Sequence, residues 1–566
     1  MANFKSNYLF RKIFLVILLI IFLFSPFNPS LASQFPQAAI ASAHPLATET
    51  GHQILAAGGN AFDAAIAITA SLAVLEPMSS GLGGGAFWLL HRQDGHEIML
   101  DGREKAPLAA SRDMYLDAKG NVIPDLSISG PLAAAIPGIP AGIVYIAKHY
   151  GKLPLQISLA AAIKQAQEGF KVDKRYQRMA KFRLKALQSS PAAAAIFLKN
   201  NEVPPIDHVI VQDDLADTLQ QIALHGSAGF YQGEIAKKMV EGVRAAGGIW
   251  SARDLSSYQV KARTPIQGEY RGIRISTAAP PSSGGIALLT ILNILAEYPL
   301  EDMDAGTQKH LVIEAMRRAY RDRAQYLGDS DYVRIPWKRL TSRDYAAGLR
   351  ASIRLDRAMP SALLPGVEKI NSGRDTTHFS VMDREGNRVS STLTINYPFG
   401  SCFVAPGTGI LLNDEMDDFS SKPGTPNAYG LVGAEANAIA PGKRPLSSMS
   451  PTFLEDNRGI VVLGTPGGSR IISMVLLAIL DYAHGNGQPQ SMVSLPRYHH
   501  QYLPDQVYFE AEALPKVIQT QLTTLGHKLQ VSRGKYGNMQ AVMWDKIHKK
   551  MLAASDPRGV GAGVVR

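Results

Sequence analysis

The stretch DTTHFSVMDREGNRVSSTLTIN, residues 375–396, decides the fold of this chain. Residues 377–383 alternate in polarity as a strand does, residues 384–387 have the composition of a turn, and residues 388–396 form a return strand. Two such runs joined by a short polar turn that contains glycine are typical of a β-hairpin. The stretch therefore predicts an antiparallel pair of strands.

The turn fixes which residues face each other across this hairpin. If it centres near Glu385-Gly386, the numbers of paired residues sum to about 770 or 771. Thr394 then lies opposite Thr376 or one step away, and Asn396 lies one side-chain repeat further along the same face. The turn therefore brings a threonine hydroxyl and an amide to the start of the first strand.

Thr376 can act as a nucleophile only if a base activates its hydroxyl. One solution uses the amine of an N-terminal threonine as that base, which here requires a cut between Asp375 and Thr376. The hairpin alone still favours an ordinary strand residue at this position, because threonine is common in strands. A loop elsewhere in the chain shifts that balance toward catalysis.

This loop covers residues 464–470, between an apolar strand at 459–463 and a helix at 471–483. Its glycine pair, Gly467-Gly468, and the helix N-terminus expose backbone N–H groups toward one point. Such an arrangement binds anions, including the oxyanion that develops during acyl transfer. Phosphate-binding loops look similar, so the loop alone indicates an anion site of either kind.

A second glycine-rich segment, residues 81–85, follows a helix predicted over residues 61–75 and capped by Asn60. A dinucleotide-binding fingerprint needs a strand before its glycines and a helix after them. Here a helix precedes the glycines and a strand, residues 86–90, follows them. The segment therefore indicates close packing of a helix against a sheet.

The middle of the chain adds further elements. We expect two short strands within 258–275, a turn at 280–285, an apolar helix from about 286 and a helix over about 307–326. Four arginines on the last helix are expected on a solvated or salt-bridged face, where Glu314 has the spacing to pair with Arg318. Residues 342–374 are irregular and read as a flexible connection.

Composition excludes several classes of function. The chain has 566 residues, 46% of them hydrophobic, and a net charge of +10 that shows no patch or stripe typical of nucleic-acid binding. The single cysteine, Cys402, excludes an intrachain disulfide and is expected to be a small residue beside a strand. No HExxH motif is present, and His499 and His500 point in different directions on any regular element, so we expect no metal and no other cofactor.

The N-terminus has the order of a secretory signal. Lys5, Arg11 and Lys12 precede an apolar run at 13–24, and small residues follow up to residue 33. The run is short for a membrane span, which needs about 20 apolar residues, although an uncleaved signal anchor is the alternative. We expect residues 1–33 to be a signal peptide and the protein to be exported, periplasmic or secreted, without a stable membrane anchor.

The segment Asp375-Thr376-Thr377-His378-Phe379-Ser380-Val381 closely resembles the sequence around the nucleophile of the gamma-glutamyltransferases, also called gamma-glutamyltranspeptidases. The resemblance extends across nearly the whole mature chain. Its other segments are 81–85, 280–285, 326–329, 409–420, 444–452, 465–470, 497–504 and 555–558. So many matches in the same order make the resemblance far more specific than any single motif.

The resemblance implies an α+β fold, the four-layer αββα sandwich of N-terminal-nucleophile hydrolases. It also implies a proenzyme that cuts itself between Asp375 and Thr376 into a large subunit, 34–375, and a small subunit, 376–566, which remain one compact unit. The mature enzyme would act on glutathione and other gamma-glutamyl compounds. It would pass the gamma-glutamyl group to water, amino acids or peptides.

Roles for individual residues follow from the same resemblance. Thr376 matches the nucleophile, and Thr394 matches the residue that hydrogen-bonds the amine of that nucleophile. Gly467 and Gly468 match the oxyanion hole. The residues that match contacts of the substrate α-carboxylate are Arg103, Ser447 and Ser448, and those that match contacts of the substrate α-amine are Asn396, Glu415 and Asp418. Residues 421–433 match a lid loop, with Tyr429 at the gating position. Position 415 is glutamate where some members have glutamine.

Two alternatives remain at this stage. A related exported amidase, such as a cephalosporin acylase or a poly-gamma-glutamate depolymerase, would share the fold, although two acids at 415 and 418 suit an α-amine that a glutaryl group lacks. A non-catalytic exported binding protein would keep the fold and never cut itself. The retained residues at the site favour the enzyme.

Overall fold

The computed structural model describes residues 34–364, 376–425, 427 and 430–566. The predicted signal peptide at 1–33, Asp375 and Tyr429 lie outside these residues. Residues 35–566 form one compact unit. Within the described part of the chain, no helix is both long and apolar enough to cross a membrane.

The hairpin that begins at Thr376 lies in the middle of a seven-stranded antiparallel sheet. Its strands, in spatial order, are β18 (Ala562–Val565), β1 (Ala39–Ser42), β9 (Thr377–Met382), β10 (Arg388–Thr394), β2 (Gly85–His91), β3 (Glu97–Gly102) and β6 (Lys261–Arg263). Thr377 pairs with Leu393 and Ser380 with Ser390, which confirms the lower of the two predicted registers. The return strand ends at Thr394, earlier than predicted, because Asn396 adopts a positive φ of 75°.

A second antiparallel sheet of six strands packs against the first. Its spatial order is β17 (Lys550–Ser555), β16 (Gln540–Asp545), β12 (Gly459–Gly464), β11 (Thr452–Glu455), β8 (Ile273–Thr277) and β7 (Ile266–Tyr270). The prediction of two strands within 258–275 was wrong, because three are present and they divide between the two sheets. Pro265 separates β6 from β7, since proline cannot donate to a ladder, and Arg271-Gly272 makes the turn to β8 with positive φ at both residues.

Both sheets contain strands from either side of position 376. In the seven-stranded sheet, β9 and β10 lie between β1 and β2, and β18 closes the edge beyond β1. In the six-stranded sheet, β7 and β8 extend an array whose other four strands come from the C-terminal part of the chain. The two halves of the sequence are therefore interleaved within both sheets.

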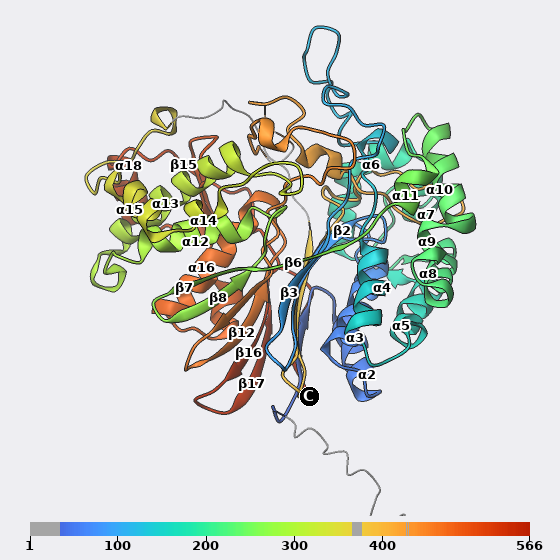
Figure 1. Cartoon of the computed structure of the whole chain (residues 1–566), viewed down its shortest axis with the longest axis horizontal. Helices are drawn as coiled ribbons and strands as arrows, with labels where there is room; N and C mark the ends of the chain where they lie inside the picture. Colours follow the sequence, from blue (N-terminus) through green and yellow to red (C-terminus); the bar gives the residue numbers. More distant parts are fainter. Residues whose placement is uncertain (1–33, 365–375, 426, 428–429) are drawn as a thin grey trace, which may run out of the picture. The chain divides into compact units, whose positions relative to one another are not determined.

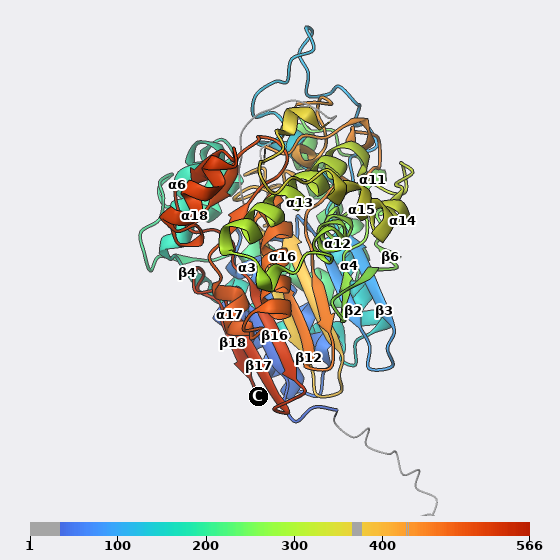
Figure 2. The same cartoon turned by 90° about the vertical axis from the view of Figure 1, so that its left-hand side faces the viewer.

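Helices cover the outer faces of both sheets (Figures 1 and 2). The helices that precede β6 are α2 (Pro45–Ala56), α3 (Ala61–Leu75), α4 (Ile139–His149), α5 (Leu155–Glu168), α6 (Lys174–Gln188), α7 (Pro191–Phe197), α8 (Asp213–His225), α9 (Ala228–Tyr231), α10 (Gly233–Ala245) and α11 (Ala252–Ser256). Those that follow β8 are α12 (Gly284–Leu295), α13 (Ala305–Tyr326), α14 (Trp337–Leu340), α15 (Arg343–Ala351), α16 (Ile471–His484), α17 (Pro489–Ser494) and α18 (Lys516–Thr524). This arrangement confirms the predicted four-layer αββα sandwich.

Several local predictions can be compared directly with the structure. Asn60 and Asp63 form a reciprocal capping box at the start of α3, whose residues are all buried, as the apolar run predicted. Glu314 and Arg318 pair at 2.7 Å, as their spacing predicted. The irregular reading of residues 342–374 was wrong at its start, because the Ser342 hydroxyl accepts from Tyr345 N–H and caps the nine-residue helix α15.

Candidate active site

A small pocket gathers most of the predicted site residues beyond the N-terminal end of β9. Its lining comprises Arg103, Thr376, Thr394, Asn396, Asp418, Leu431, Ser447, Ser448, Met449, Gly468, Ser469 and Ile471. Its volume is about 20 Å³, roughly the space of one water molecule. Two predicted residues are not among those lining it: Glu415 lies against Arg103, and Gly467 lines a neighbouring cavity.

The end of the hairpin orients the side chains of Thr394 and Asn396. The Thr394 hydroxyl accepts a hydrogen bond from Asn396 N–H at 2.8 Å, and the Asn396 amide donates to the carbonyl of Asp414 at 3.0 Å. Gly84 packs so closely on the backbone of Thr394 that a β-carbon there would overlap its carbonyl oxygen. The second glycine-rich segment therefore packs against the end of a strand, which places Thr394 beside Thr376.

The loop after β12 also approaches Thr376. Gly467 and Gly468 have φ angles of 141° and 55°, which disfavour residues with a side chain, and a short 3-10 turn then leads into α16. The loop is held from behind, because the Tyr320 hydroxyl donates to the Ser469 carbonyl and the Ser469 hydroxyl donates to Gln501 at 2.7 Å. The predicted glycine pair therefore lies directly before a helix N-terminus, with Gly468 lining the pocket and Gly467 the neighbouring cavity.

A buried cluster of charges lies on the other side of the pocket. Arg103 follows β3 and is 1% exposed. Its guanidinium lies 2.5 Å from the Asp418 carboxylate, 2.8 Å from Glu415 and 3.4 Å from Glu104. The guanidinium also donates to the carbonyl of Pro445 at 3.2 Å. Arg103 therefore holds together a loop of acidic residues and the segment that carries Ser447 and Ser448.

Three acids around one arginine alter one another's protonation. Burial raises the pKa of Glu415 well above its ordinary value, and Glu104 and Asp418 add to this while Arg103 opposes it. Burial likewise raises the pKa of Glu104 to about 7. Burial acts to lower the pKa of Arg103, but the neighbouring carboxylates outweigh it and raise that pKa. The cluster therefore favours holding a proton on its carboxylates near neutral pH.

Known proteins can now be compared with this fold and pocket. A sequence model of the family described as gamma-glutamyltranspeptidase matches residues 47–565. The chain belongs to the gamma-glutamyltranspeptidase family. It is 43% identical over 511 residues to a glutathione hydrolase proenzyme of Pseudomonas sp. (strain A14), covering 89% of each chain.

Two further similarities support membership of the gamma-glutamyltranspeptidase family. The chain is 40% identical over 529 residues to the glutathione hydrolase proenzyme of Escherichia coli (strain K12), covering 93% of this chain and 91% of that protein. The crystal structure of a cephalosporin acylase from Bacillus halodurans superposes with a TM-score of 0.82 at 29% identity, covering 96% of this chain and 99% of the other.

The structure adds a second cation to the site of this gamma-glutamyltranspeptidase family member. Arg323 on α13 donates to the Ser448 hydroxyl at 3.2 Å and to the Ser283 hydroxyl at 2.9 Å. It is 4% exposed, and burial lowers its pKa to about 10. The sequence placed it in an arginine cluster on a solvated or salt-bridged face. Arg317 and Arg318 are indeed salt-bridged but buried, while Arg323 instead bonds the two serines named above.

A second group missed from the sequence lies behind β9, the strand that follows Thr376. The Thr377 hydroxyl donates at 2.7 Å to Glu76, which is 1% exposed and is paired with Arg175 at 2.5 Å. On the opposite face of the strand, His378 Nδ1 lies 2.9 Å from the Thr392 hydroxyl, and burial lowers the pKa of His378 to about 3. A charged pair and a neutral histidine thus fix the two residues that follow Thr376.

The predicted lid loop contacts the acidic part of the pocket. The Asn427 amide donates to Asp418 Oδ1 at 3.0 Å, and Leu431 lines the pocket. Tyr429, the predicted gating residue, lies outside the described residues. Asp418 is therefore held between Arg103 on one oxygen and the loop on the other.

Two residue groups outside the pocket have structural roles. Cys402 is 1% exposed and receives a hydrogen bond from Arg183, and burial raises the pKa of its thiol to about 11, which suits the packing role expected for it. His310 and His527 lie close to Glu314, with their ring nitrogens 2.8 Å apart in a hydrogen bond. Glu314 is engaged by Arg317 and Arg318. Cys402 therefore contributes to packing beside α6, and the histidine pair contributes to packing beside α13.

The raised pKa of Glu104 predicts a pH dependence of stability. A carboxyl whose pKa rises from 4.5 to about 7 on folding binds more protons in the native state between these values. Its ionisation therefore lowers the free energy of unfolding as pH rises through that window, by up to about 3 kcal/mol. Glu104→Gln should match the wild type near pH 5 and have the higher midpoint of thermal unfolding near pH 8. A midpoint difference that does not grow with pH would contradict this prediction.

Proposed function

We propose that this protein is an exported gamma-glutamyltransferase and glutathione hydrolase, made as a precursor that cuts itself between Asp375 and Thr376. The large chain would run from about residue 34 to 375 and the small chain from 376 to 566. The observation that carries the proposal is the ion-paired set of one arginine and two acids beside Thr376: Arg103 and Glu415 are buried and Asp418 is partly buried. The similarity to glutathione hydrolase proenzymes supports the same activity.

The arrangement suits recognition of an amino acid by both of its charges. Arg103 pairs directly with Asp418 in this structure. A γ-glutamyl group carries an α-carboxylate and an α-ammonium, so it would exchange this one ion pair for two. The carboxylate would bind Arg103 with help from Ser447 and Ser448, and the ammonium would bind Asp418 and Glu415. The charge buried in the pocket would then stay balanced, because the incoming group is itself zwitterionic.

The chemistry follows from the residues around this pocket. After the cut, the free amine of Thr376 would take the hydroxyl proton while the oxygen attacks the γ-carbonyl carbon. The N–H groups of Gly467 and Gly468 would stabilise the oxyanion, and Thr394 would orient the amine. The leaving amine would take the proton as the C–N bond breaks and a threonine ester remains. Water or an acceptor amine would then attack the ester and restore Thr376.

A second candidate function is that of a related amidase, favoured by the likeness to the cephalosporin acylase structure. The two differ in the acyl group, since a glutaryl group has no α-amine. Asp418 lines the pocket and Glu415 lies close behind it against Arg103. These two acids favour the ammonium, because charged hydrogen bonds contribute about 1.5–3 kcal/mol each.

Two matched substrates test the proposed function. The purified enzyme should hydrolyse γ-glutamyl 4-nitroanilide with a kcat/KM at least about 100-fold above that for glutaryl 4-nitroanilide. N-terminal sequencing of the smaller chain should begin at Thr376. Preference for the glutaryl compound would favour the acylase, and an uncut chain without either activity would favour a binding protein.

A further inference from the structure

A larger cavity lies along the same loop that borders the Thr376 pocket. Gly468 and Ser469 line the small pocket, whereas the two preceding residues, Pro466 and Gly467, line a cavity of about 680 Å³. That volume is within the range of small-molecule sites in proteins. The charged residues around the cavity are Arg175, Arg178, Arg533, Lys535 and Arg558.

The lining of this cavity has one sign of charge. It contains four arginines and one lysine, and no aspartate or glutamate occurs among its described lining residues. Helix α6, which supplies two of the arginines, has six basic residues and no acid. A cleft lined by charges of one sign concentrates ions of the opposite sign. The cavity therefore favours an anionic ligand.

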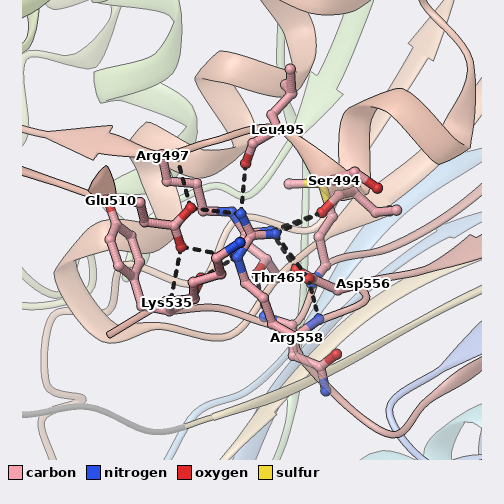
Figure 3. Close-up of polar contacts among 12 residues, drawn as sticks. Thr465, Ser494, Leu495, Arg497, Glu510, Lys535, Asp556 and Arg558 are labelled. Carbon is pink, nitrogen blue, oxygen red and sulfur yellow. Dashed lines mark hydrogen bonds and ion pairs between the residues drawn. The ribbon is translucent and has the colours of Figure 1, made fainter. Parts of the chain in front are cut away.

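Three of the five cations already have carboxylate partners. Arg175 pairs with Glu76 at 2.5 Å, and Lys535 pairs with Glu512 at 3.0 Å. Arg558 is clamped by Glu510 at 2.6 Å and Asp556 at 3.1 Å, in the network drawn in Figure 3. Arg558 is held firmly in the wall, because it also donates to the carbonyls of Val493 and Leu495. Because each of these three cations is paired with a carboxylate, together they add little net positive charge to the cavity.

Arg178 and Arg533 are different. Both are exposed, and among the described residues no carboxylate lies within ion-pair distance of either guanidinium. They come from α6 and from the segment after β15 (Leu529–Val531), so two separate parts of the chain bring their charges to one cavity. These two cations are therefore available to an incoming anion.

We infer that this cavity receives the part of the substrate beyond the scissile amide, and that Arg178 and Arg533 bind a carboxylate on it. The inference rests on the proposed function, in which the γ-carbonyl lies at Gly467-Gly468. The acyl side of that carbonyl faces the small pocket, which Gly468 lines, and the cavity adjoins Gly467, the other of these two glycines. Leaving groups and acceptors that carry a carboxylate, as peptides do at their C-terminus, are the ligands this charge selects.

Two anilides that differ by one carboxylate test this assignment. We compare kcat/KM for γ-glutamyl 3-carboxy-4-nitroanilide with that for γ-glutamyl 4-nitroanilide. In Arg178→Gln/Arg533→Gln the ratio of these two values should fall by roughly 5- to 10-fold, the effect of losing two solvent-exposed charge contacts. The wild-type ratio should also fall as salt rises from about 0.01 to 0.5 M, because screening weakens exposed charge pairs.

The matched control is Lys185→Gln/Lys528→Gln, which removes the same charge from exposed positions. Lys185 lies two turns from Arg178 on α6, about 10 Å along the helix and beyond a Debye length at physiological salt. Its ratio should stay within about 2-fold of the wild type, a difference of under about 0.5 kcal/mol. A ratio that is unchanged in Arg178→Gln/Arg533→Gln, or that falls equally in the control, overturns the assignment alone. Failure to hydrolyse either anilide overturns the proposed function and the assignment together.

Discussion

Replacing Thr376 with alanine is expected to leave the chain uncut and to lower hydrolysis of γ-glutamyl 4-nitroanilide by at least about 10³-fold. The same hydroxyl would serve two reactions, because it attacks the preceding peptide during maturation and the γ-amide during turnover. Denaturing gel electrophoresis of the purified protein measures the first reaction, and release of nitroaniline measures the second.

Thr376→Ser is the matched control, since it keeps the hydroxyl and removes only a methyl group. It should be cut and retain activity, with both rates reduced. The pocket remains otherwise intact in either variant, because Thr394 is held by Asn396 and Gly84 and not by the Thr376 methyl alone. A Thr376→Ala protein that yields two chains with the small one starting at residue 376 would remove Thr376 from the mechanism.

Replacing Arg103 with glutamine should have the second largest effect, on stability and activity together. The change leaves Glu415, Glu104 and Asp418 without the cation that they share. Removing one partner of a buried ion pair typically destabilises a protein by about 3–5 kcal/mol. Loss of the guanidinium should also lower kcat/KM for the γ-glutamyl anilide by about 10²-fold or more, because a buried carboxylate contact contributes about 2–5 kcal/mol.

A double variant separates these two effects. Arg103→Gln/Glu415→Gln removes the guanidinium together with one of the buried carboxyl groups that it pairs with, so the midpoint of thermal unfolding should recover part of its loss. The low kcat/KM should persist, because the substrate α-carboxylate still lacks its partner. If activity recovered in step with the unfolding midpoint, Arg103 would have a structural role only.

The sequence predicted those parts of the molecule that depend on near neighbours. The hairpin register followed from a four-residue turn. The cap of α3 followed from Asn60 and Asp63, which are three residues apart. The division of residues 258–275 between two sheets depended on Pro265 and on which sheet each strand meets, which local periodicity does not report. The helix α15 was missed for a different reason, because its nine residues are too few for the 3.6-residue periodicity to stand out.

The candidate site also has a part that the sequence predicted and a part that only the structure shows. The residues around Thr376 came from the family resemblance, and the structure brings most of them into one pocket. The contacts between them join distant positions: Arg103 meets Asp418, and Arg323 meets Ser448. Glu76 lies some 300 residues before Thr377, and its carboxylate accepts a hydrogen bond from the Thr377 hydroxyl. No pattern in either neighbourhood indicates such a partner, so these residues could be recognised only after folding.

The interleaved sheets set the order in which this molecule can be made. With β9 and β10 between β1 and β2, a cut at 375–376 would divide a sheet whose strands alternate between the two products. Folding must then precede the cut, because joining two separate chains in this pattern is a bimolecular reaction that also exposes edge strands. Once cut, the protein should stay folded because it unfolds slowly, and not because folding and unfolding are at a reversible equilibrium. Denaturation of the mature enzyme should therefore be a one-way event, while the uncut precursor keeps the ability to refold.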